Sequence, residues 1–455
     1  MTLGRRRLAI VVLAAIVALT AVAVWRGCAS SGSPGTLPAG GGQVARLIAY
    51  TPADRADRER RAAAGLAQVL FAKSPGGAVA TAARVAKLRP LVDRAAHGCV
   101  VPAGTLEAIV FLESAGEPAA RASNDLRGAV GLTQILAQTG AGLLGMRVDS
   151  AASAAITRRL RRTRDPRTRR ILLARRARVD ERFDPAKALA GTCRYLRFAK
   201  SRLGGREDLA VQSYHMGVGN LQRALKAYGQ GPVPYAQLYF DSSPLRHAAA
   251  WSVIGPLGDD SSTYYWRILA AARIMRDFRA DRGGLEAEQR LRAAVPSAER
   301  VLHPPPSTPR FADAGALETS ALVLLDGKVL GQNAGRLSNE LLGAPAGERA
   351  LRPAAAQALK TLLSAVAATA PGAGPLTITA ATRSVAGERK LGLAFGIEAA
   401  PSMHTTGYAF DISRAYRSRA QAQALQFWLD RLTALNLIAW ARLPATIHVA
   451  AAGLN

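Results

Sequence analysis

Before a proline-rich stretch at residues 303–309, apolar residues recur every three to four positions along much of the chain. This spacing is typical of amphipathic helices that bury one face. It predicts two or three helices over residues 44–97, a helix around residues 106–112 and a longer one over residues 185–203. Aromatic residues make up only 5% of the chain, so alanine and leucine must supply most of the core of this helical part.

After the proline-rich stretch the pattern changes to short apolar runs that are typical of strands. Residues 375–381 predict one strand, and the runs at 321–325 and 328–330 predict a hairpin around the Asp-Gly pair between them. A helix is predicted over residues 352–369. We therefore expect a multidomain protein with a mainly α part, a stiff proline-rich linker and a smaller α+β part.

The N-terminus carries an uncharged apolar run from Leu8 to Trp25, preceded by three arginines. Its length lies between a long signal-peptide core and a short membrane-spanning helix, and the preceding arginines orient the rest of the chain outward. We favour an uncleaved anchor over a cleaved signal peptide, because no small-x-small site follows and Arg26 lies directly behind the run. Arg26 also makes a poor lipoprotein signal before Cys28, and residues 29–43 predict a flexible tether.

Four short motifs follow one another in the helical part. The first places Glu113 at a helix end beside apolar neighbours, where desolvation raises the pKa of a carboxyl group as a general acid requires. The plain alternative is an exposed glutamate that ends an amphipathic helix. The motifs are Glu113-Ser114, Gly131-Leu132-Thr133-Gln134, Ser213-Tyr214-His215-Met216-Gly217 and Tyr264-Tyr265-Trp266-Arg267-Ile268-Leu269.

In this order the motifs resemble those of the goose-lysozyme-like lytic transglycosylases, which cleave the glycan of peptidoglycan. That family has Glu-Ser, Gly-Leu-x-Gln, Ala-Tyr-Asn-x-Gly and a tyrosine that leads an apolar helix. The resemblance covers roughly residues 92–278 and departs from the third motif at Ser213 and His215. It implies a mainly α, lysozyme-like domain that acts on peptidoglycan and needs no cofactor.

The resemblance also implies a mechanism with a single carboxylate, although Glu117 and Asp125 are near Glu113 in the sequence. Glu113 would protonate the oxygen between N-acetylmuramic acid and N-acetylglucosamine, and would then take the C6 hydroxyl proton so that a 1,6-anhydro ring closes. Tyr265 would orient Glu113. The other matched residues would bind or position the sugar: Ser114, Gly131, Gln134, Tyr214 and His215.

A second motif lies in the α+β part, Ser402-Met403-His404-Thr405-Thr406-Gly407-Tyr408-Ala409-Phe410-Asp411. It resembles the Ser-x-His-x-x-Gly-x-Ala-x-Asp motif of zinc D-alanyl-D-alanine carboxypeptidases. The resemblance implies that His404, Asp411 and His448 bind zinc and that Arg383 holds a substrate carboxylate. Such a set leaves one position for water, as in a catalytic zinc site. The alternative is that both histidines are structural.

That family has a general-base glutamate three residues before the last histidine, and this chain has Ala445 there. Zinc can activate water without this base, but the leaving amine then lacks a proton donor. We therefore interpret the domain as a relative that has lost peptidase activity and binds wall peptide, with or without metal.

Cys99 and Cys193 are the two cysteines of the helical part. In an exported domain such a pair suggests one disulfide, and the alternative is two buried free thiols.

The net charge of +28 draws the protein to polyanions. Residues 148–182 form a densely basic insertion that Pro166 divides into two short helices. We interpret it as a docking surface for anionic wall polymers or lipids, against the alternative of a solvated insertion. No nucleic-acid partner is expected, because the chain has no recognisable binding module and few aromatic residues to stack on bases.

Together these features predict a cell-envelope protein, extracytoplasmic (periplasmic) and anchored in the inner membrane. The favoured function is a lytic transglycosylase with a peptide-binding second domain. The alternatives are a bifunctional enzyme that also cuts peptide with zinc, and a non-catalytic wall-binding scaffold. The predicted parts are an anchor or signal peptide (1–28), a flexible linker (29–43), a helical spacer (44–91), the transglycosylase domain (92–285), a Pro-rich linker (286–310) and the degenerate carboxypeptidase-like domain (311–455).

Overall fold

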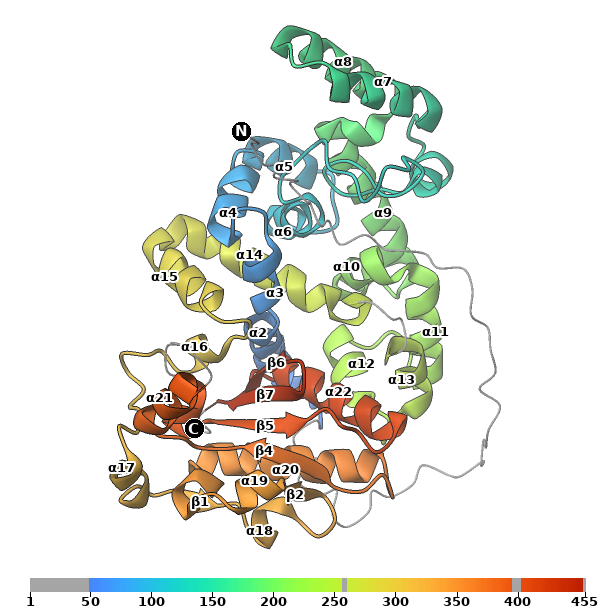
Figure 1. The fold of residues 1–455 in the computed structure, drawn as a ribbon. Coiled ribbons are helices and arrows are strands. Elements are labelled where there is room, and N and C mark those ends of the chain that lie inside the picture. Colours follow the sequence, from blue (N-terminus) through green and yellow to red (C-terminus); the bar gives the residue numbers. More distant parts are fainter. Residues whose placement is uncertain (1–48, 256–259, 395–401, 453–455) are drawn as a thin grey trace. The chain divides into compact units, whose positions relative to one another are not determined.

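The computed structural model describes residues 49–255, 260–394 and 402–452 (Figure 1). Contacts divide these residues into two compact units. Unit 1 comprises Val69–Leu238 and Ala249–Glu286, and unit 2 comprises residues 49–68, Tyr239–Ala248 and the chain from Ala287 onward. The described residues are mostly helical with a smaller α/β part, as the sequence predicted in outline. The predicted domain boundaries remain predictions.

The apolar run Leu8–Trp25 lies outside the described residues. Within the ranges that the structure covers, no helix has both the length and the apolar composition needed to cross a bilayer.

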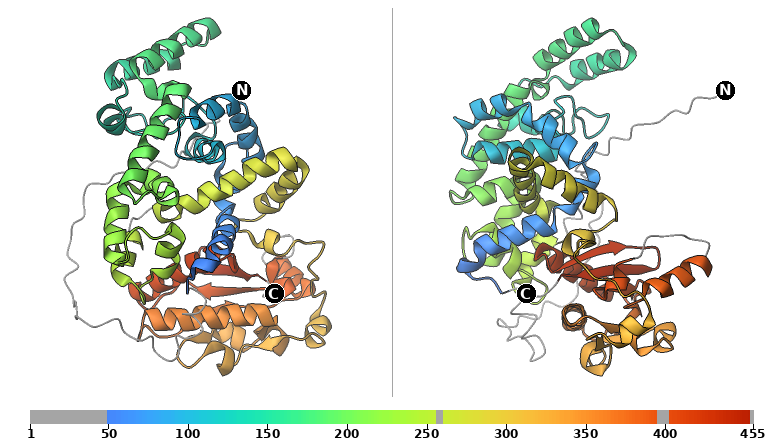
Figure 2. Two further views of the ribbon diagram at one scale, coloured as in Figure 1. Left: turned by 180° about the vertical axis from the view of Figure 1, so that it is seen from behind. Right: turned by 90° about the vertical axis from the view of Figure 1, so that its left-hand side faces the viewer.

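Unit 1 is built from helices around α6, which packs against α4, α5 and α14 (Figures 1 and 2). Leu106, Ile109 and Val110 of α6 are fully buried at this centre. The helices of unit 1, with those that it shares with unit 2 at its ends, are α3 (Gln68–Lys73), α4 (Ala78–Ala86), α5 (Arg89–Ala96), α6 (Ala103–Ser114), η3 (Thr139–Leu143), α7 (Ser150–Arg162), α8 (Pro166–Val179), η4 (Glu181–Phe183), α9 (Pro185–Arg202), α10 (Glu207–Met216), α11 (Val218–Tyr228), α12 (Tyr235–Asp241), α13 (Ala248–Ile254), η6 (Asp260–Thr263), α14 (Tyr264–Ala280) and α15 (Arg282–Ala293).

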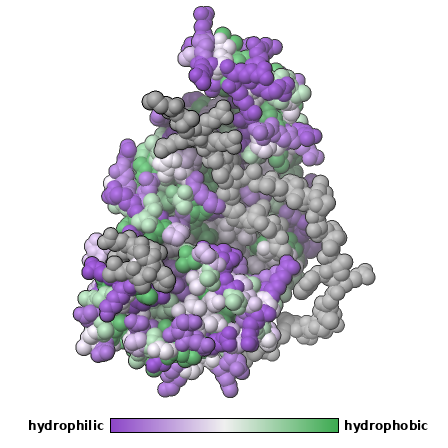
Figure 3. Space-filling view, in the orientation of Figure 1, coloured by the Kyte–Doolittle hydropathy of each residue, from purple (hydrophilic) through white to green (hydrophobic). Residues whose placement is uncertain are grey.

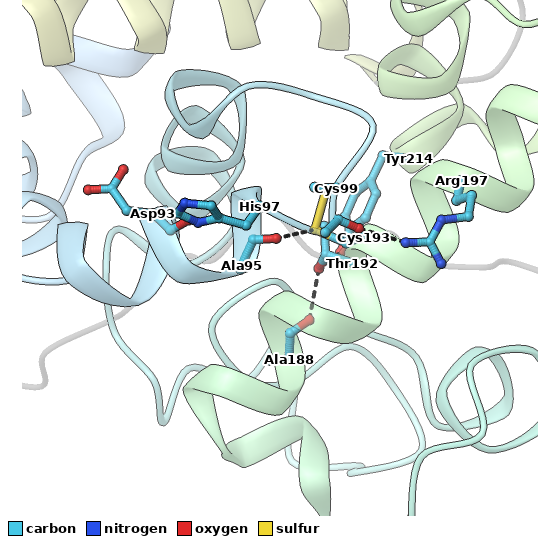
Figure 4. Close-up of a disulfide and its surroundings, with 10 residues drawn as sticks. Asp93, Ala95, His97, Cys99, Ala188, Thr192, Cys193, Arg197 and Tyr214 are labelled. Carbon is cyan, nitrogen blue, oxygen red and sulfur yellow. Dashed lines mark hydrogen bonds between the residues drawn. A yellow bond between two sulfur atoms is a disulfide. The ribbon is translucent and has the colours of Figure 1, made fainter.

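A disulfide joins Cys99, which precedes α6, to Cys193 of α9 (Figure 4). The bond closes a loop across 94 positions of sequence. Of the two alternatives that the sequence left open, the structure therefore contains the cross-link. The disulfide holds the segment that leads into α6 against α9. Thr192 lies on the same turn of α9 as Cys193.

The basic insertion forms a hairpin of α7 and α8, as predicted from Pro166, which occupies the first turn of α8. The Asp165 side chain caps α8 by accepting hydrogen bonds from the backbone of Arg167 and Thr168. Ile156, Leu160 and Leu172 form a small core between the two helices. The hairpin projects from the rest of unit 1 in every view, and its surface is mostly hydrophilic (Figures 2 and 3).

Unit 2 contains a five-stranded sheet in the order β2-β4-β5-β7-β6, with β2 and β4 parallel and the other pairs antiparallel. Helices α20 and α22 pack on each other and on the sheet. The elements of unit 2 are η2 (Pro52–Asp54), α2 (Arg55–Gly65), α16 (Glu299–Leu302), α17 (Ala314–Glu318), β1 (Val323–Leu324), α18 (Gly327–Leu330), β2 (Gly335–Leu337), α19 (Asn339–Leu342), η7 (Ala346–Arg349), β3 (Ala350–Leu351), α20 (Pro353–Thr369), β4 (Leu376–Ala380), α21 (Val385–Ala394), η8 (Met403–Thr406), β5 (Ala409–Ser413), α22 (Arg419–Ala434), β6 (Ile438–Arg442) and β7 (Thr446–Ala451).

The hairpin predicted around Asp326 is wrong. β1 pairs with β3 instead, and residues after Asp326 form the short helix α18. The reason is local, because the Asp326 carboxylate accepts hydrogen bonds from the backbone of Lys328 and Val329 and so starts a helix.

The segment predicted as a linker is partly packed on unit 2. We call residues 297–311 the strap. Its helix α16 packs against β6 and β7, and His303 is buried with its ring stacked on Tyr408 at a centroid distance of 3.9 Å. The strap is therefore a fixed part of unit 2 at these points and not a free spacer.

Candidate functional site

Glu113 lies in the last turn of α6, which ends because Ala115 adopts a left-handed conformation with φ of 53°. The turn directs Glu113 into a cavity of about 990 Å³ that lies within unit 1. The lining combines cationic, acidic and apolar side chains, among them Lys73, Arg84, Phe111, Glu117, Arg121 and Arg267. A cavity of this size accommodates an extended ligand of several rings.

The surroundings of Glu113 favour its protonated form. Its Oε1 accepts a hydrogen bond of 2.7 Å from the hydroxyl of Tyr264. Burial raises the pKa of Glu113 to about 7, although the Tyr264 hydrogen bond and the charge of Arg267 both act to lower it. A carboxyl group with this pKa can donate a proton near neutral pH and then accept one, as general acid–base catalysis requires.

The residue that contacts Glu113 is one position from the predicted one. We expected Tyr265 to orient Glu113, but the hydrogen bond comes from Tyr264. The Tyr265 ring packs against Tyr235 and Trp266, and its backbone N–H donates to Gln212. Two adjacent tyrosines point about 100° apart on a helix, so only one of them can face α6.

The third motif supports Tyr264. His215 stacks on the Tyr264 ring with a centroid distance of 5.4 Å, and its Nδ1 lies 2.7 Å from the Ser261 hydroxyl. Tyr214 donates a hydrogen bond of 2.8 Å to the carbonyl of Thr133. The third motif is thereby connected to both the second and the fourth.

The second motif, residues 131–134, forms a turn that Tyr214 joins to the third motif. Gly131 has φ of 81°, and Gln134 Nε2 donates a hydrogen bond of 2.8 Å to the Gly131 carbonyl. The Oε1 atom of Gln134 is buried and has no hydrogen-bond partner among the residues that the structure describes. A ligand hydroxyl or amide could therefore satisfy it.

Arg182 holds this turn in place, and sequence reasoning missed it. Its guanidinium is fully buried in an ion pair with Asp180 and donates to three backbone carbonyls, those of Leu126, Gly128 and Ile135. A Cβ atom at Gly131 would lie 1.8 Å from the Arg182 carbonyl oxygen. The sequence offered no signal for this role, because Arg182 was one more arginine in a basic stretch.

The remaining predicted residues of this site are also placed. Ser114 is buried and its hydroxyl donates to the Val110 carbonyl within α6. Glu117 lines the cavity, with its side chain 59% exposed and 3.6 Å from Arg84. Asp125 forms an ion pair with Arg127. Glu113 is thus the acid that the surrounding protein desolvates.

In unit 2 the predicted metal ligands converge. Asp411 of β5 and His448 of β7 are direct partners across the two strands, and η8 brings His404 beside them. One ligand atom from each residue lies within 4.8 Å of those of the other two. Two imidazoles and a carboxylate are a donor set that fits zinc.

The closest atoms show which nitrogen of each ring faces the centre. Asp411 Oδ1 lies 3.2 Å from His404 Nε2 and 2.8 Å from His448 Nδ1. The other nitrogens have acceptors of their own, since His404 Nδ1 lies 2.6 Å from the Ala381 carbonyl and His448 Nε2 lies 2.8 Å from Glu299 Oε2. Metal-binding histidines commonly use the second nitrogen in this way.

Electrostatics in this cluster is strong. Burial acts to raise the pKa of Asp411, but hydrogen bonds from His404 and His448 outweigh burial and hold that pKa well below its usual range. Burial acts to lower the pKa of His448, and hydrogen bonds to Asp411 and Glu299 raise it to about 9. Glu299 comes from the strap. The motif Ser402–Asp411, which predicted the metal ligands, gave no indication of it.

The two other positions predicted for the site in unit 2, Arg383 and Ala445, are less closely connected to the metal ligands. Arg383 follows β4, and its backbone N–H donates to the His404 carbonyl. Ala445 is exposed in the turn before β7, with no side-chain group that could act on a proton. The general-base glutamate of the carboxypeptidase motif therefore has no substitute at position 445.

Comparison with known proteins bears on unit 1. No curated protein and no solved structure gives a significant match to this chain. The family model described as the transglycosylase SLT domain matches residues 90–233, which contain the first three motifs and end before Tyr264. Residues 90–233 are therefore similar to the transglycosylase SLT domain, and this family match suggests a lytic transglycosylase that acts on peptidoglycan.

Proposed function

We propose that unit 1 cleaves the β-1,4 bond between N-acetylmuramic acid and N-acetylglucosamine and leaves a 1,6-anhydro end. The observation that carries this proposal is Glu113, a desolvated acid held by Tyr264 at the wall of a cavity of about 990 Å³. The family match over residues 90–233 supports the same substrate.

The chemistry needs one carboxyl group. Protonated Glu113 gives its proton to the glycosidic oxygen, and the bond from that oxygen to C1 of the muramic acid breaks. The acetamido oxygen of the substrate stabilises C1. The Glu113 carboxylate then removes the C6 hydroxyl proton, and O6 bonds to C1. The proton that Glu113 lost is restored, and no water is consumed.

The hydrolytic alternative requires a second carboxylate to activate water. Glu117 is the candidate for that role, because it lines the same cavity. Its side chain is 59% exposed and lies 3.6 Å from the Arg84 guanidinium, which competes with a water molecule for the carboxylate oxygens. We therefore favour ring closure over hydrolysis.

The test is mass analysis of muropeptides released from purified sacculi by the full-length protein and its Glu113→Gln variant. We expect anhydro-ended products from the wild type and none from the variant. Hydrated ends would make unit 1 a lysozyme, and release by Glu113→Gln would refute the role of Glu113. A scaffold would release nothing in either case.

For unit 2 we propose that the sheet binds the peptide of peptidoglycan at the cluster of His404, Asp411 and His448, with zinc as the metal it would take. Zinc would supply Lewis acidity there, and the protein would supply the ligands and Arg383 for a carboxylate. Because Ala445 offers no base, we expect binding without cleavage. Release of D-alanine from sacculi that stops on chelation would favour the bifunctional enzyme instead.

We further propose that the protein is anchored in the inner membrane, faces the periplasm, and rests its α7–α8 hairpin on anionic lipid. Residues 150–179 contain eleven arginines and one aspartate, and that aspartate caps α8. On α8 the exposed Ile171 (60% accessible) directly follows Arg170, and Arg167 and Arg178 lie on its face of the helix, four positions before it and seven positions after it. An apolar side chain among cations suits a lipid surface better than a soluble polymer.

Sedimentation with vesicles tests this docking. Changing Arg167, Arg170 and Arg178 together to glutamine should weaken binding to vesicles with anionic headgroups by about 100-fold, at about 1 kcal/mol for each charge. The matched control changes three exposed arginines elsewhere in unit 1, namely Arg94, Arg194 and Arg276. Equal losses in both triple variants would show that only net charge matters, and would refute a defined docking surface.

A further inference from the structure

Glu299 lies in the strap, before the domain in which the metal ligands were predicted, and 149 positions from His448 in sequence. Its Oε2 nevertheless lies 2.8 Å from His448 Nε2. We propose that Glu299 is a positioning residue of the metal centre, which orients His448 so that Nδ1 faces the metal. This inference rests on the metal centre proposed for unit 2 and is independent of glycan cleavage.

The geometry of the two rings supports this role. Each histidine has one nitrogen near Asp411 and the other near a protein acceptor, Ala381 O for His404 and Glu299 Oε2 for His448. An acceptor at Nε2 keeps the proton on Nε2 and leaves the Nδ1 lone pair for a metal. Without Glu299 the ring could rotate or carry its proton on Nδ1.

The two carboxylates of the cluster match the charge of a divalent cation. Glu299 is 7% exposed and the Asp411 side chain is 14% exposed, so two carboxylates share a buried site with two histidines. Metal ligation requires neutral imidazoles, and the two carboxylates would then balance the charge of a bound divalent ion. Asp411 alone would balance only one of the two positive charges of such an ion.

Several contacts outside the cluster hold the strap and so fix the position of Glu299. His303 Nε2 donates to the Ala451 carbonyl at the end of β7, at 2.6 Å. Arg310 donates to the Ser402 carbonyl, and the backbone N–H of Phe311 donates to Thr405. The strap is thereby bonded to both segments that carry the histidines.

The position of Glu299 also separates it from the missing base. A general base must reach the water on the open side of the metal, whereas Glu299 bonds the nitrogen of His448 that faces away from Asp411. Glu299 therefore strengthens metal binding without restoring the catalytic part lost at Ala445.

Zinc affinity of the full-length protein tests the proposal, measured by competition with a chromophoric chelator. We expect Glu299→Ala to weaken zinc binding 10- to 100-fold, as removal of such outer partners typically does. The zinc affinity of Glu299→Gln should lie between those of the wild type and Glu299→Ala, because the amide oxygen of glutamine can still accept the hydrogen bond from His448 Nε2. The control is Glu318→Gln, an exposed glutamate of the same unit, and His404→Ala should lose binding altogether.

A second readout follows the strap itself. If Glu299 joins the strap to the metal centre, zinc should slow tryptic cleavage after Arg300 and Arg310 in the wild type but not in Glu299→Ala. Zinc affinity of Glu299→Ala within threefold of the wild type would overturn the role of Glu299 alone. A wild type that binds no zinc would overturn the metal centre and this inference together, while anhydro-ended products would be unaffected.

Discussion

At the residue scale the most informative side chain is Glu113, because its protein environment favours the protonated form at a cost to the ionised one. A carboxyl group whose pKa is raised on folding binds its proton more tightly in the folded state than in the unfolded state. Folding stability from this group is present below the ordinary pKa of 4.5 and is lost as pH rises to about 7.

Glu113→Gln should therefore be more stable than the wild type at pH 8, by up to about 3 kcal/mol, because the shift of the pKa from 4.5 to about 7 sets the upper limit. The difference should vanish near pH 4, where both side chains are neutral. Urea unfolding at the two pH values measures it. Equal stability at pH 8 would mean that Glu113 is not desolvated.

Tyr264→Phe removes the hydrogen bond that stabilises the Glu113 carboxylate, so the pKa of Glu113 should rise further. We expect glycan cleavage to fall by about 10- to 100-fold, with its decline at high pH displaced to higher pH. The pH dependence of cleavage measures both effects. Tyr265→Phe is the matched control and should leave the pH profile in place, and the reverse result would restore the original prediction.

These residues also show how far sequence alone reaches. Four ordered motifs led to the prediction of Glu113 as the acid, and the structure brings the four motifs together in one unit. Helical phase decided between Tyr264 and Tyr265, and it depends on where α14 begins, which a motif does not specify. The support from His215 was equally hidden, because stacking between α10 and α14 is a tertiary property.

At the scale of elements, the turn Gly131–Gln134 depends on its contact with Arg182. Gly131→Ala places a Cβ atom 1.8 Å from a carbonyl oxygen at a φ of 81°, so we expect a loss of about 3 kcal/mol or more and loss of cleavage. Gly142→Ala is the control, since its Cβ would meet no atom within 4 Å. Thermal unfolding compares the two variants. A stable, active Gly131→Ala would mean that the turn can shift away from Arg182.

Helices and strands were predicted correctly where neighbouring residues determine them, and wrongly where contacts with residues distant in the sequence determine them. Pro166 correctly divided α7 from α8, and the apolar spacing found α6. The run after Asp326 has an apolar pattern that suits a strand, but the capping carboxylate turned it into a helix. A two-residue strand whose paired residues lie 26 and 28 positions away leaves little trace in the sequence.

At the scale of the molecule, the Cys99–Cys193 bond should contribute to the stability of unit 1. Closing a loop across 94 positions restricts the unfolded chain and is worth about 4.7 kcal/mol on chain-entropy grounds. The double Cys99→Ser, Cys193→Ser variant should unfold at lower denaturant, and a reducing agent should shift the wild type but not the variant. No shift in the reduced wild type would mean that the bond is absent in solution.

The strap shows what sequence could not reveal at this scale. Prolines after His303 favoured a spacer, yet the buried ring of His303 and the carboxylate of Glu299 bind it to unit 2. Such packing involves partners 148 and 149 positions away, beyond any local pattern.

The hairpin of α7 and α8 contains arginine as its only basic residue type, without a single lysine or histidine between residues 150 and 179. Guanidinium groups keep their proton at every physiological pH, so adhesion through this hairpin has no acid-sensitive switch. The cleavage proposed for Glu113 does have one, because burial raises the pKa of Glu113 to about 7. If both proposals hold, a change in local acidity alters the rate of cleavage while the hairpin stays on the lipid, whereas a rise in salt releases the hairpin from the lipid without altering that chemistry.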